Sequence, residues 1–209
     1  MKTLIAMPIA DKPETPFLVS LLNMKIETTA NFSVTHATLI YDARNKLAKD
    51  AIDGGYDRIL FLDADMTFDS DLMQRLEKRM DEGYDLVTGL YFTRRPPWTP
   101  VIYKELKYIP QEGGRVLPFA EAYMDYPQNE VFDIKACGFG GCIVSTELVR
   151  KITDKYGLPF TPQPGFGEDL SFCLRAAEFG AKMVCDSSIK LGHIMHSVMN
   201  EETWRAKIG

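Results

Sequence analysis

The chain has 209 residues, of which 24 are basic and 29 are acidic, and its formal net charge is −5. This length suits one sizeable domain and is short for two. Charges of one sign do not gather in long runs, so neither a nucleic-acid partner nor an anionic membrane surface is indicated. Apolar runs fall well short of the roughly 20 residues that span a bilayer, and residues 1–13 lack a secretory core, so we expect a cytoplasmic protein without a membrane span.

The cysteines are not expected to carry chemistry. They lack the paired C-x-x-C spacing of a zinc cluster, and in a chain of this size we expect them to be buried thiols. These residues are Cys137, Cys142, Cys173 and Cys185.

Strand and helix patterns alternate through the first 92 residues. Apolar strands are expected at 3–9, 31–39, 58–62 and 85–91, and helices at 15–27, 41–52 and about 69–83. Thr15, and either Asp69 or Ser70, are the expected helix caps. Such alternation is typical of right-handed βαβ units around a parallel sheet, so residues 1–92 are predicted to form a nucleotide-binding half.

The pattern changes between residues 93 and 130, where prolines and aromatic residues alternate. They predict irregular or hairpin structure, which either covers the core or forms a lid or wall for an acceptor. Strand character returns at 131–145, and glycines 138, 140 and 141 there predict a close approach of the backbone to a ligand.

The remaining elements complete a second half of the chain, residues 93–209. A helix is expected at 146–156, followed by a proline- and glycine-rich loop at 158–167. A second helix then runs from Glu168 to about 179, and a last short strand is expected at 182–185. The chain is therefore predicted to be a single α/β domain with two functional halves.

Asp63 and Asp65 follow directly on the apolar residues 58–62. A short strand of this kind is buried on both faces of a parallel sheet, and ligands bind beyond the carboxyl ends of such strands. Two carboxylates on that turn can present oxygens to a hard divalent cation. An isolated Asp-x-Asp also occurs as a turn cap beside a solvated residue, so its surroundings must decide.

Two further features have similar settings. Glu168 and Asp169 open a helix after the proline- and glycine-rich loop, and His193 follows the last predicted strand. The acidic pair is also what a helix dipole alone would favour at this position. His196 is a weaker metal-ligand candidate, and His36, on a predicted strand, is expected to be structural.

Together these motifs resemble the GT-A class of glycosyltransferases, particularly the family 2-like enzymes. The marks of that class are an apolar strand ending in Asp-x-Asp, a later Glu-Asp pair at a helix start, and a downstream histidine. The matching segments are residues 5–8, 61–65, 138–142, 167–172 and 192–194. The resemblance implies a Rossmann-like mixed sheet flanked by helices. It also implies transfer of a sugar from a nucleoside diphosphate, such as a UDP- or GDP-sugar, to an acceptor hydroxyl.

The resemblance implies a bound Mn²⁺, or Mg²⁺, that neutralises the departing diphosphate. Asp65 would bind the metal, and His193 would complete the protein ligands. Asp63 would contact either the ribose or, through a water molecule, the metal. An imidazole ligand suits Mn²⁺ better than Mg²⁺. The residues implied in donor binding are Pro8, Ala10, Asp11, Arg44, Asp63 and Ala64.

The resemblance also implies that the second half, residues 93–209, binds the acceptor and carries the catalytic groups. Asp169 would accept the proton of the acceptor hydroxyl as general base, and Glu168 would orient the acceptor or the sugar. An available base favours inversion of the anomeric centre. For Arg44 the alternative to a donor contact is an exposed helical arginine.

Other functions fit parts of the pattern. Residues 62–67 also match the strand-end Asp-x-Asp-x-Thr of haloacid-dehalogenase-like phosphatases, with Asp63 as nucleophile, although that strand usually lies near the N-terminus. A sugar-1-phosphate nucleotidyltransferase normally has a glycine-rich basic loop after its first strand, and residues 10–16 contain no glycine. A noncatalytic sugar-nucleotide-binding module is the third alternative.

Overall fold

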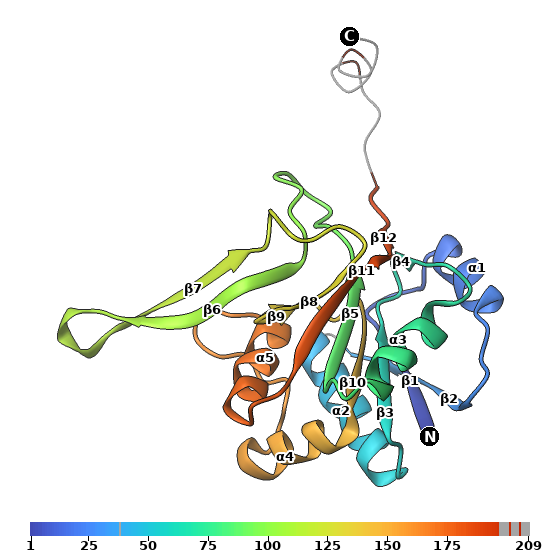
Figure 1. Cartoon of the computed structure of the whole chain (residues 1–209), viewed down its shortest axis with the longest axis horizontal. Coiled ribbons are helices and arrows are strands. Elements are labelled where there is room, and N and C mark those ends of the chain that lie inside the picture. Colours follow the sequence, from blue (N-terminus) through green and yellow to red (C-terminus); the bar gives the residue numbers. More distant parts are fainter. Residues whose placement is uncertain (38, 197–200, 202–204, 206–209) are drawn as a thin grey trace.

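A computed structural model of the chain, shown in Figure 1, describes residues 1–37, 39–196, 201 and 205. The first half contains β1 (Lys2–Ile9), α1 (Thr15–Asn23), β2 (Thr29–His36), α2 (Ile40–Asp53), β3 (Arg58–Leu62), β4 (Met66–Thr67), α3 (Leu72–Asp81) and β5 (Leu86–Leu90). The second half contains β6 (Ile102–Pro110), η1 (Glu112–Gly114), β7 (Val116–Ala122), β8 (Val131–Asp133), β9 (Ala136–Cys137), β10 (Gly141–Ser145), α4 (Thr146–Tyr156), α5 (Glu168–Glu178), β11 (Met183–Lys190) and β12 (Gly192–His193).

The central sheet has seven strands in the order β2-β1-β3-β10-β5-β11-β8. Strands β2, β1 and β3 are parallel, as predicted, but β10 lies antiparallel between β3 and β5. The purely parallel surroundings expected for residues 58–62 are therefore wrong on one side. The chain leaves β5 at the carboxyl edge of the sheet and returns from that same side, so β10 must run in the opposite direction (Figure 1).

Apolar side chains pack on both faces of this sheet. Ile59 and Phe61 of β3 point to the face covered by α2, α4 and α5, and Leu60 and Leu62 point to the face covered by α1 and α3. This alternation explains why residues 58–62 form a continuous apolar run, because a central strand must bury both sets of side chains. Of the helices that the structure describes, none has the length and apolar character needed to cross a membrane.

Several element boundaries differ from prediction. Helix α1 begins at Thr15 with Glu14 as its N-cap, and α3 begins after Asp71, so the predicted caps Thr15, Asp69 and Ser70 are wrong. Strand β11 extends to Lys190 instead of ending at residue 185. Residues 186–188 are polar, so the apolar pattern that predicts a strand stops before the strand does. Asp186 pairs with Arg79 at 2.9 Å, and Ser187 donates to the Pro127 carbonyl at 2.6 Å, so the buried polar groups have partners.

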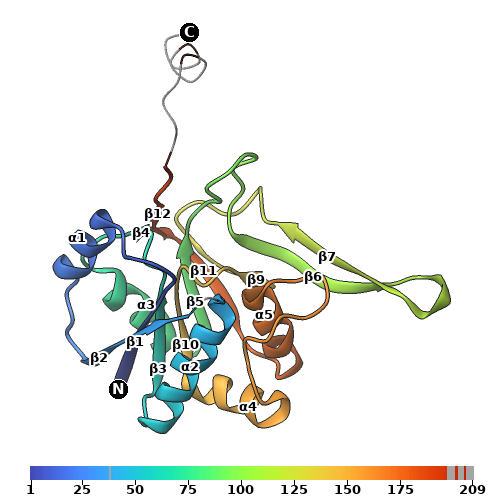
Figure 2. The same cartoon turned by 180° about the vertical axis from the view of Figure 1, so that it is seen from behind.

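The proline- and aromatic-rich segment contains a long hairpin, β6–β7, which extends away from the sheet in Figures 1 and 2. Its inner side contacts the loop at residues 158–167. The Tyr108 hydroxyl donates to the Pro164 carbonyl at 2.9 Å, and the Tyr108 and Phe166 rings are 5.1 Å apart. The hairpin prediction is thus confirmed, and the hairpin helps to hold the loop that precedes Glu168.

The glycines before β10 make a different close approach from the one predicted. A Cβ atom on Gly138 would lie 2.2 Å from the Tyr91 hydroxyl, and one on Gly141 would lie 2.3 Å from Leu191. Gly140 likewise faces Met66 and Tyr91. These glycines therefore admit neighbouring side chains of the protein, and the approach of their backbone to a ligand stays a prediction. All four described cysteines are buried and free, as expected.

Four phenylalanines, Phe61, Phe139, Phe160 and Phe172, form one buried aromatic cluster below the carboxyl edge of the sheet. Phe160 and Phe172 stack with their ring centroids 4.7 Å apart, and Phe139 meets both rings edge-on at 5.1 Å. The cluster joins β3, the segment before β10, the loop at 158–167 and α5.

We expect Phe172→Ala to lower the free energy of unfolding by about 3–5 kcal/mol, because it opens a cavity in a fully buried cluster. Urea denaturation measures this change. Leu22→Ala is the matched control, since Leu22 is 85% exposed and its truncation should shift stability by less than about 0.5 kcal/mol. Equal losses in the two variants would contradict the role given to the cluster.

Candidate functional site

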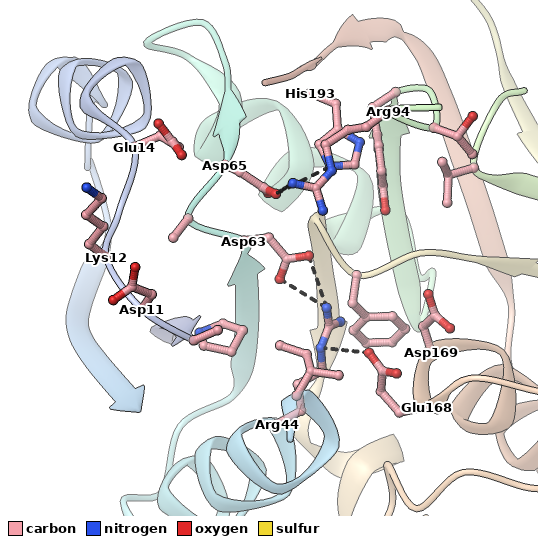
Figure 3. Close-up of a pocket in the computed structure, with 18 residues that line it drawn as sticks. Asp11, Lys12, Glu14, Arg44, Asp63, Asp65, Arg94, Glu168, Asp169 and His193 are labelled. Carbon is pink, nitrogen blue, oxygen red and sulfur yellow. Dashed lines mark hydrogen bonds and ion pairs between the residues drawn. The ribbon is translucent and has the colours of Figure 1, made fainter. Parts of the chain in front are cut away.

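A cavity of about 620 Å³ lies at the carboxyl edge of β1 and β3 (Figure 3). It brings together every residue to which the resemblance gave a donor, metal or catalytic role. Those residues are Pro8, Ala10, Asp11, Arg44, Asp63, Ala64, Asp65, Glu168, Asp169 and His193. The cavity therefore collects side chains from β1, α2, the turn after β3, the start of α5 and β12.

The turn that carries Asp63 and Asp65 is fixed by its backbone. The Asp63 amide donates to the Gly140 carbonyl at 3.0 Å, the Glu14 amide donates to the Ala64 carbonyl at 2.9 Å, and the Ile194 amide donates to the Asp65 carbonyl at 2.8 Å. Three distant segments thus hold three consecutive residues. This fixes where both carboxylates leave the backbone without using the carboxylates themselves.

The pairing of two short strands places His193 beside Asp65. Strand β12 runs antiparallel to β4, which follows the Asp-x-Asp turn, and His193 lies opposite Met66. Its Nε2 is 3.6 Å from Asp65 Oδ2, and its Nδ1 is 2.8 Å from the Phe92 carbonyl oxygen. In the neutral imidazole, Nδ1–H donates to that carbonyl, which leaves the lone pair of Nε2 directed towards Asp65.

The Asp65–His193 contact changes the pKa of both side chains. Burial opposes the change in each case. The contacts with His193 and Arg94 nevertheless hold the pKa of Asp65 below its ordinary value. The contacts with Asp65 and with the Phe92 carbonyl raise the pKa of His193. Both shifts favour a protonated imidazole beside an ionised carboxylate.

Asp65 and His193 are suited to hold a divalent cation. Two ligand atoms that each lie about 2.1 Å from one ion, at angles of roughly 90–120°, are roughly 3.0–3.6 Å apart. The observed separation of 3.6 Å agrees with this. The described residues contain no group of three or more His, Cys, Asp or Glu side chains placed to hold a metal. A cation here would therefore take its other ligands from water and phosphate oxygens, as Mg²⁺ commonly does.

Arg44 is buried, with a side-chain exposure of 3%, so its alternative interpretation as an exposed helical arginine is wrong. Its Nη2 donates to both Asp63 oxygens, at 3.0 and 3.1 Å, and its Nε lies 3.5 Å from Glu168 Oε1. The guanidinium carbon lies 5.4 Å from the centre of the Phe139 ring. Burial opposes a raised pKa, but the carboxylates around Arg44 raise it.

Asp63 and Asp169 both have raised pKa values. Burial raises the pKa of Asp63 to about 6 although Arg44 opposes this. Burial, followed by the charge of Glu168, also raises the pKa of Asp169. A carboxylate with a raised pKa is a stronger base than an ordinary one, so the position of Asp169 suits proton acceptance.

The loop before α5 is fixed at several points. The Phe160 amide donates to Asn45 Oδ1 at 2.8 Å, and the Gln163 amide donates to Ser171 Oγ at 2.7 Å. Arg175 Nη1 donates to the Pro159 carbonyl at 2.9 Å. These contacts set the position of the first turn of α5. Glu168 and Asp169 lie in that turn, where the helix dipole also favours acidic residues.

The other histidines lie away from the Asp65–His193 pair. His196 Nε2 is 2.9 Å from Glu14 Oε1 and is exposed, and His36 is exposed at the end of β2. Sequence reasoning missed other cavity residues, namely Lys12, Glu14, Ile40, Tyr91, Thr93, Arg94, Val101 and Phe139. Arg94 had a usable signal, because it follows β5 much as the Asp-x-Asp turn follows β3.

No protein-family model matches the sequence, and no curated protein sequence matches it. Solved structures with similar folds include A197 from STIV, with 20% identity and a TM-score of 0.63 over 94% of this chain and 87% of that chain. A structure of GalNAc-T7 with UDP, GalNAc and Mn²⁺ has 10% identity and a TM-score of 0.59 over 93% of this chain. TarS from S. aureus, residues 1–349, has 16% identity and a TM-score of 0.55 over 92% of this chain.

This chain spans 44% of the GalNAc-T7 chain and 60% of the TarS chain. At these identities the similarity establishes the fold. The predicted fold class is confirmed: the chain has a GT-A-like mixed sheet flanked by helices.

We expect Asp169→Asn to unfold at a higher temperature than the parent at pH 7, with a difference that shrinks towards pH 4. Folding raises the pKa of Asp169, so its ionised form costs stability as pH rises from its unfolded pKa, about 3.9, through its folded pKa. Thermal melts across this pH range measure the effect. Asp154→Asn, in the exposed part of α4, is the control. A stability difference independent of pH would contradict this assignment.

Proposed function

We propose that this protein is a metal-dependent glycosyltransferase that moves a sugar from a nucleoside diphosphate to an acceptor hydroxyl. The observation that carries the proposal is the convergence of the Asp-x-Asp turn, the Glu-Asp pair and His193 on one cavity. The cavity lies beyond the carboxyl ends of β1 and β3, where α/β sheets bind their ligands. The GT-A-like fold supports the same conclusion.

In this proposal the nucleoside of a UDP- or GDP-sugar rests against Pro8, Ala10 and Asp11. Asp65 and His193 hold Mn²⁺, or Mg²⁺, which when bound neutralises charge on the departing diphosphate. The GalNAc-T7 structure contains UDP, GalNAc and Mn²⁺, which supports this donor class and this metal. Asp63, beside Ala64, either reaches the ribose or contributes to the metal site through water.

The acceptor side of the cavity is assigned to Glu168 and Asp169. Asp169 accepts the proton of the attacking hydroxyl, and Glu168 orients the sugar or the acceptor. Arg44 connects these roles, because it contacts Asp63 on the donor side and Glu168 on the acceptor side. One base opposite the leaving diphosphate leads to inversion at the anomeric carbon.

The competing functions find less support. In a phosphatase that uses Asp63 as nucleophile, the attacking oxygen would have to give up its contact with Arg44, which donates to both Asp63 oxygens. A noncatalytic sugar-nucleotide-binding module would use the same cavity, and it differs from the proposed enzyme in producing neither hydrolysis nor transfer. Product formation from a panel of UDP- and GDP-sugars therefore separates the two.

We expect UDP or GDP binding to require a divalent cation, and Asp65→Ala to abolish the metal-dependent part of that binding. His193→Ala should weaken Mn²⁺ affinity more than it weakens nucleotide binding in metal-free buffer, because the imidazole is placed as a ligand. Calorimetry with Mn²⁺ and with EDTA measures both. Asp125→Ala, in an exposed segment beyond β7, is the control. Equal nucleotide affinities with Mn²⁺ and with EDTA would rule out the metal site.

We expect Asp169→Asn to lower turnover by roughly 10²–10⁴-fold, the usual range for loss of a general base, while keeping metal-dependent donor binding. Glu168→Gln should lower turnover less, or raise the acceptor KM, because an orienting group also contributes to binding. Steady-state kinetics with a responsive acceptor measure the difference. Transfer by Asp169→Asn at the parental rate, with an unchanged circular dichroism spectrum, would show that another group is the base.

A further inference from the structure

Two positively charged or chargeable groups approach the same oxygen of Asp65. Arg94 Nη1 lies 2.7 Å from Asp65 Oδ2, and His193 Nε2 lies 3.6 Å from that atom. Figure 3 shows both side chains directed at this carboxylate. Asp65 Oδ2 is also the atom best placed to bind a metal together with His193. Arg94 therefore occupies the contact that a divalent cation at this pair would need.

Arg94 combines a fixed backbone with an exposed side chain. It follows Thr93, whose amide donates to the Thr99 carbonyl at 2.9 Å and whose Oγ accepts from the Thr99 amide at 3.1 Å. These bonds close the base of the loop at residues 93–99. The Arg94 side chain is 50% exposed, and an exposed ion pair of this kind is easily exchanged. The guanidinium can thus leave Asp65 while its backbone stays at the cavity rim.

The excess of acidic groups in the cavity suggests a role for Arg94 once it leaves Asp65. Carboxylates outnumber the cations that line it, so an incoming diphosphate meets a mostly acidic surface. Arg44 is buried and already paired with Asp63 and Glu168, whereas Arg94 contacts the rim carboxylate. A guanidinium binds phosphate through paired hydrogen bonds, which makes Arg94 a suitable diphosphate contact once Asp65 no longer holds it.

We propose that Arg94 exchanges partners when the donor binds. In the empty site it neutralises Asp65, and when a metal takes Asp65 it turns to the phosphate oxygens of the nucleoside diphosphate. This inference rests on the proposed function. It adds a diphosphate-binding residue and a reason for the cavity to accept metal and nucleotide together. A static surface ion pair would instead leave metal and nucleotide affinities nearly unchanged when Arg94 is replaced.

The test measures Mn²⁺ binding by electron paramagnetic resonance without nucleotide, and then UDP and GDP binding at saturating Mn²⁺ by calorimetry. The variants are Arg94→Gln, Asp65→Asn and Arg95→Gln. Arg95 is exposed and next in sequence, so its variant makes the same change in net charge one residue away.

Arg94→Gln should bind Mn²⁺ about two- to fivefold more tightly, because the competing cation is gone. The same variant should bind nucleoside diphosphate about tenfold more weakly or worse, because a charged hydrogen bond to phosphate is lost. Arg95→Gln should leave both affinities within about twofold. Opposite changes in the two affinities are the expected signature of exchange.

Two failures can be told apart. If parental protein and Asp65→Asn bind Mn²⁺ equally, the metal site of the proposed function is wrong, and the exchange fails with it. If Mn²⁺ binding depends on Asp65 but Arg94→Gln tightens no metal binding, or changes both affinities as Arg95→Gln does, the metal site stands and the exchange alone is wrong.

Discussion

The buried guanidinium of Arg44 connects the parts on which the site depends. It extends from α2, donates to both oxygens of Asp63 at the end of β3, and reaches Glu168 at the start of α5. Carboxylates gathered at one sheet edge repel each other and lose hydration, and a central cation offsets both costs. Without Arg44 the strand end and the helix start would carry uncompensated charges in the same cavity. Its removal should therefore affect position as well as charge.

The surroundings of Arg44 make this interaction stronger than a surface ion pair. The aromatic cluster below it excludes water, and the guanidinium lies over Phe139 and Phe61 at 5.4 and 6.0 Å. Burial in such a setting removes hydration from a carboxylate, which is why the pKa of Asp63 rises to about 6 even beside a cation. Core packing and the electrostatics of the site are therefore coupled. The phenylalanines that stabilise the fold also keep water away from the charged groups of the site.

Local patterns in the sequence predicted the motif-bearing elements well. The apolar run at 58–62 matches β3, residues 146–156 match α4, and α5 begins at Glu168 as expected. The Asp-x-Asp and Glu-Asp motifs follow from the same local information, since each adjoins an element end. Features that depend on pairing between distant segments were harder to predict from the sequence. The antiparallel direction of β10 is set by where the preceding excursion returns to the sheet, which no local periodicity records.

The burial of Arg44 was equally hidden, because its partners lie 19 and 124 positions away along the chain. The two arginines of the cavity show what decides such a role. Arg44 is enclosed by aromatic rings and by carboxylates from two elements, so moving it would leave buried charges unpaired. Arg94 is half exposed and contacts one rim carboxylate, so water can compensate both groups when they separate. Burial therefore makes one arginine a permanent part of the scaffold. Exposure leaves the other available to respond to a ligand.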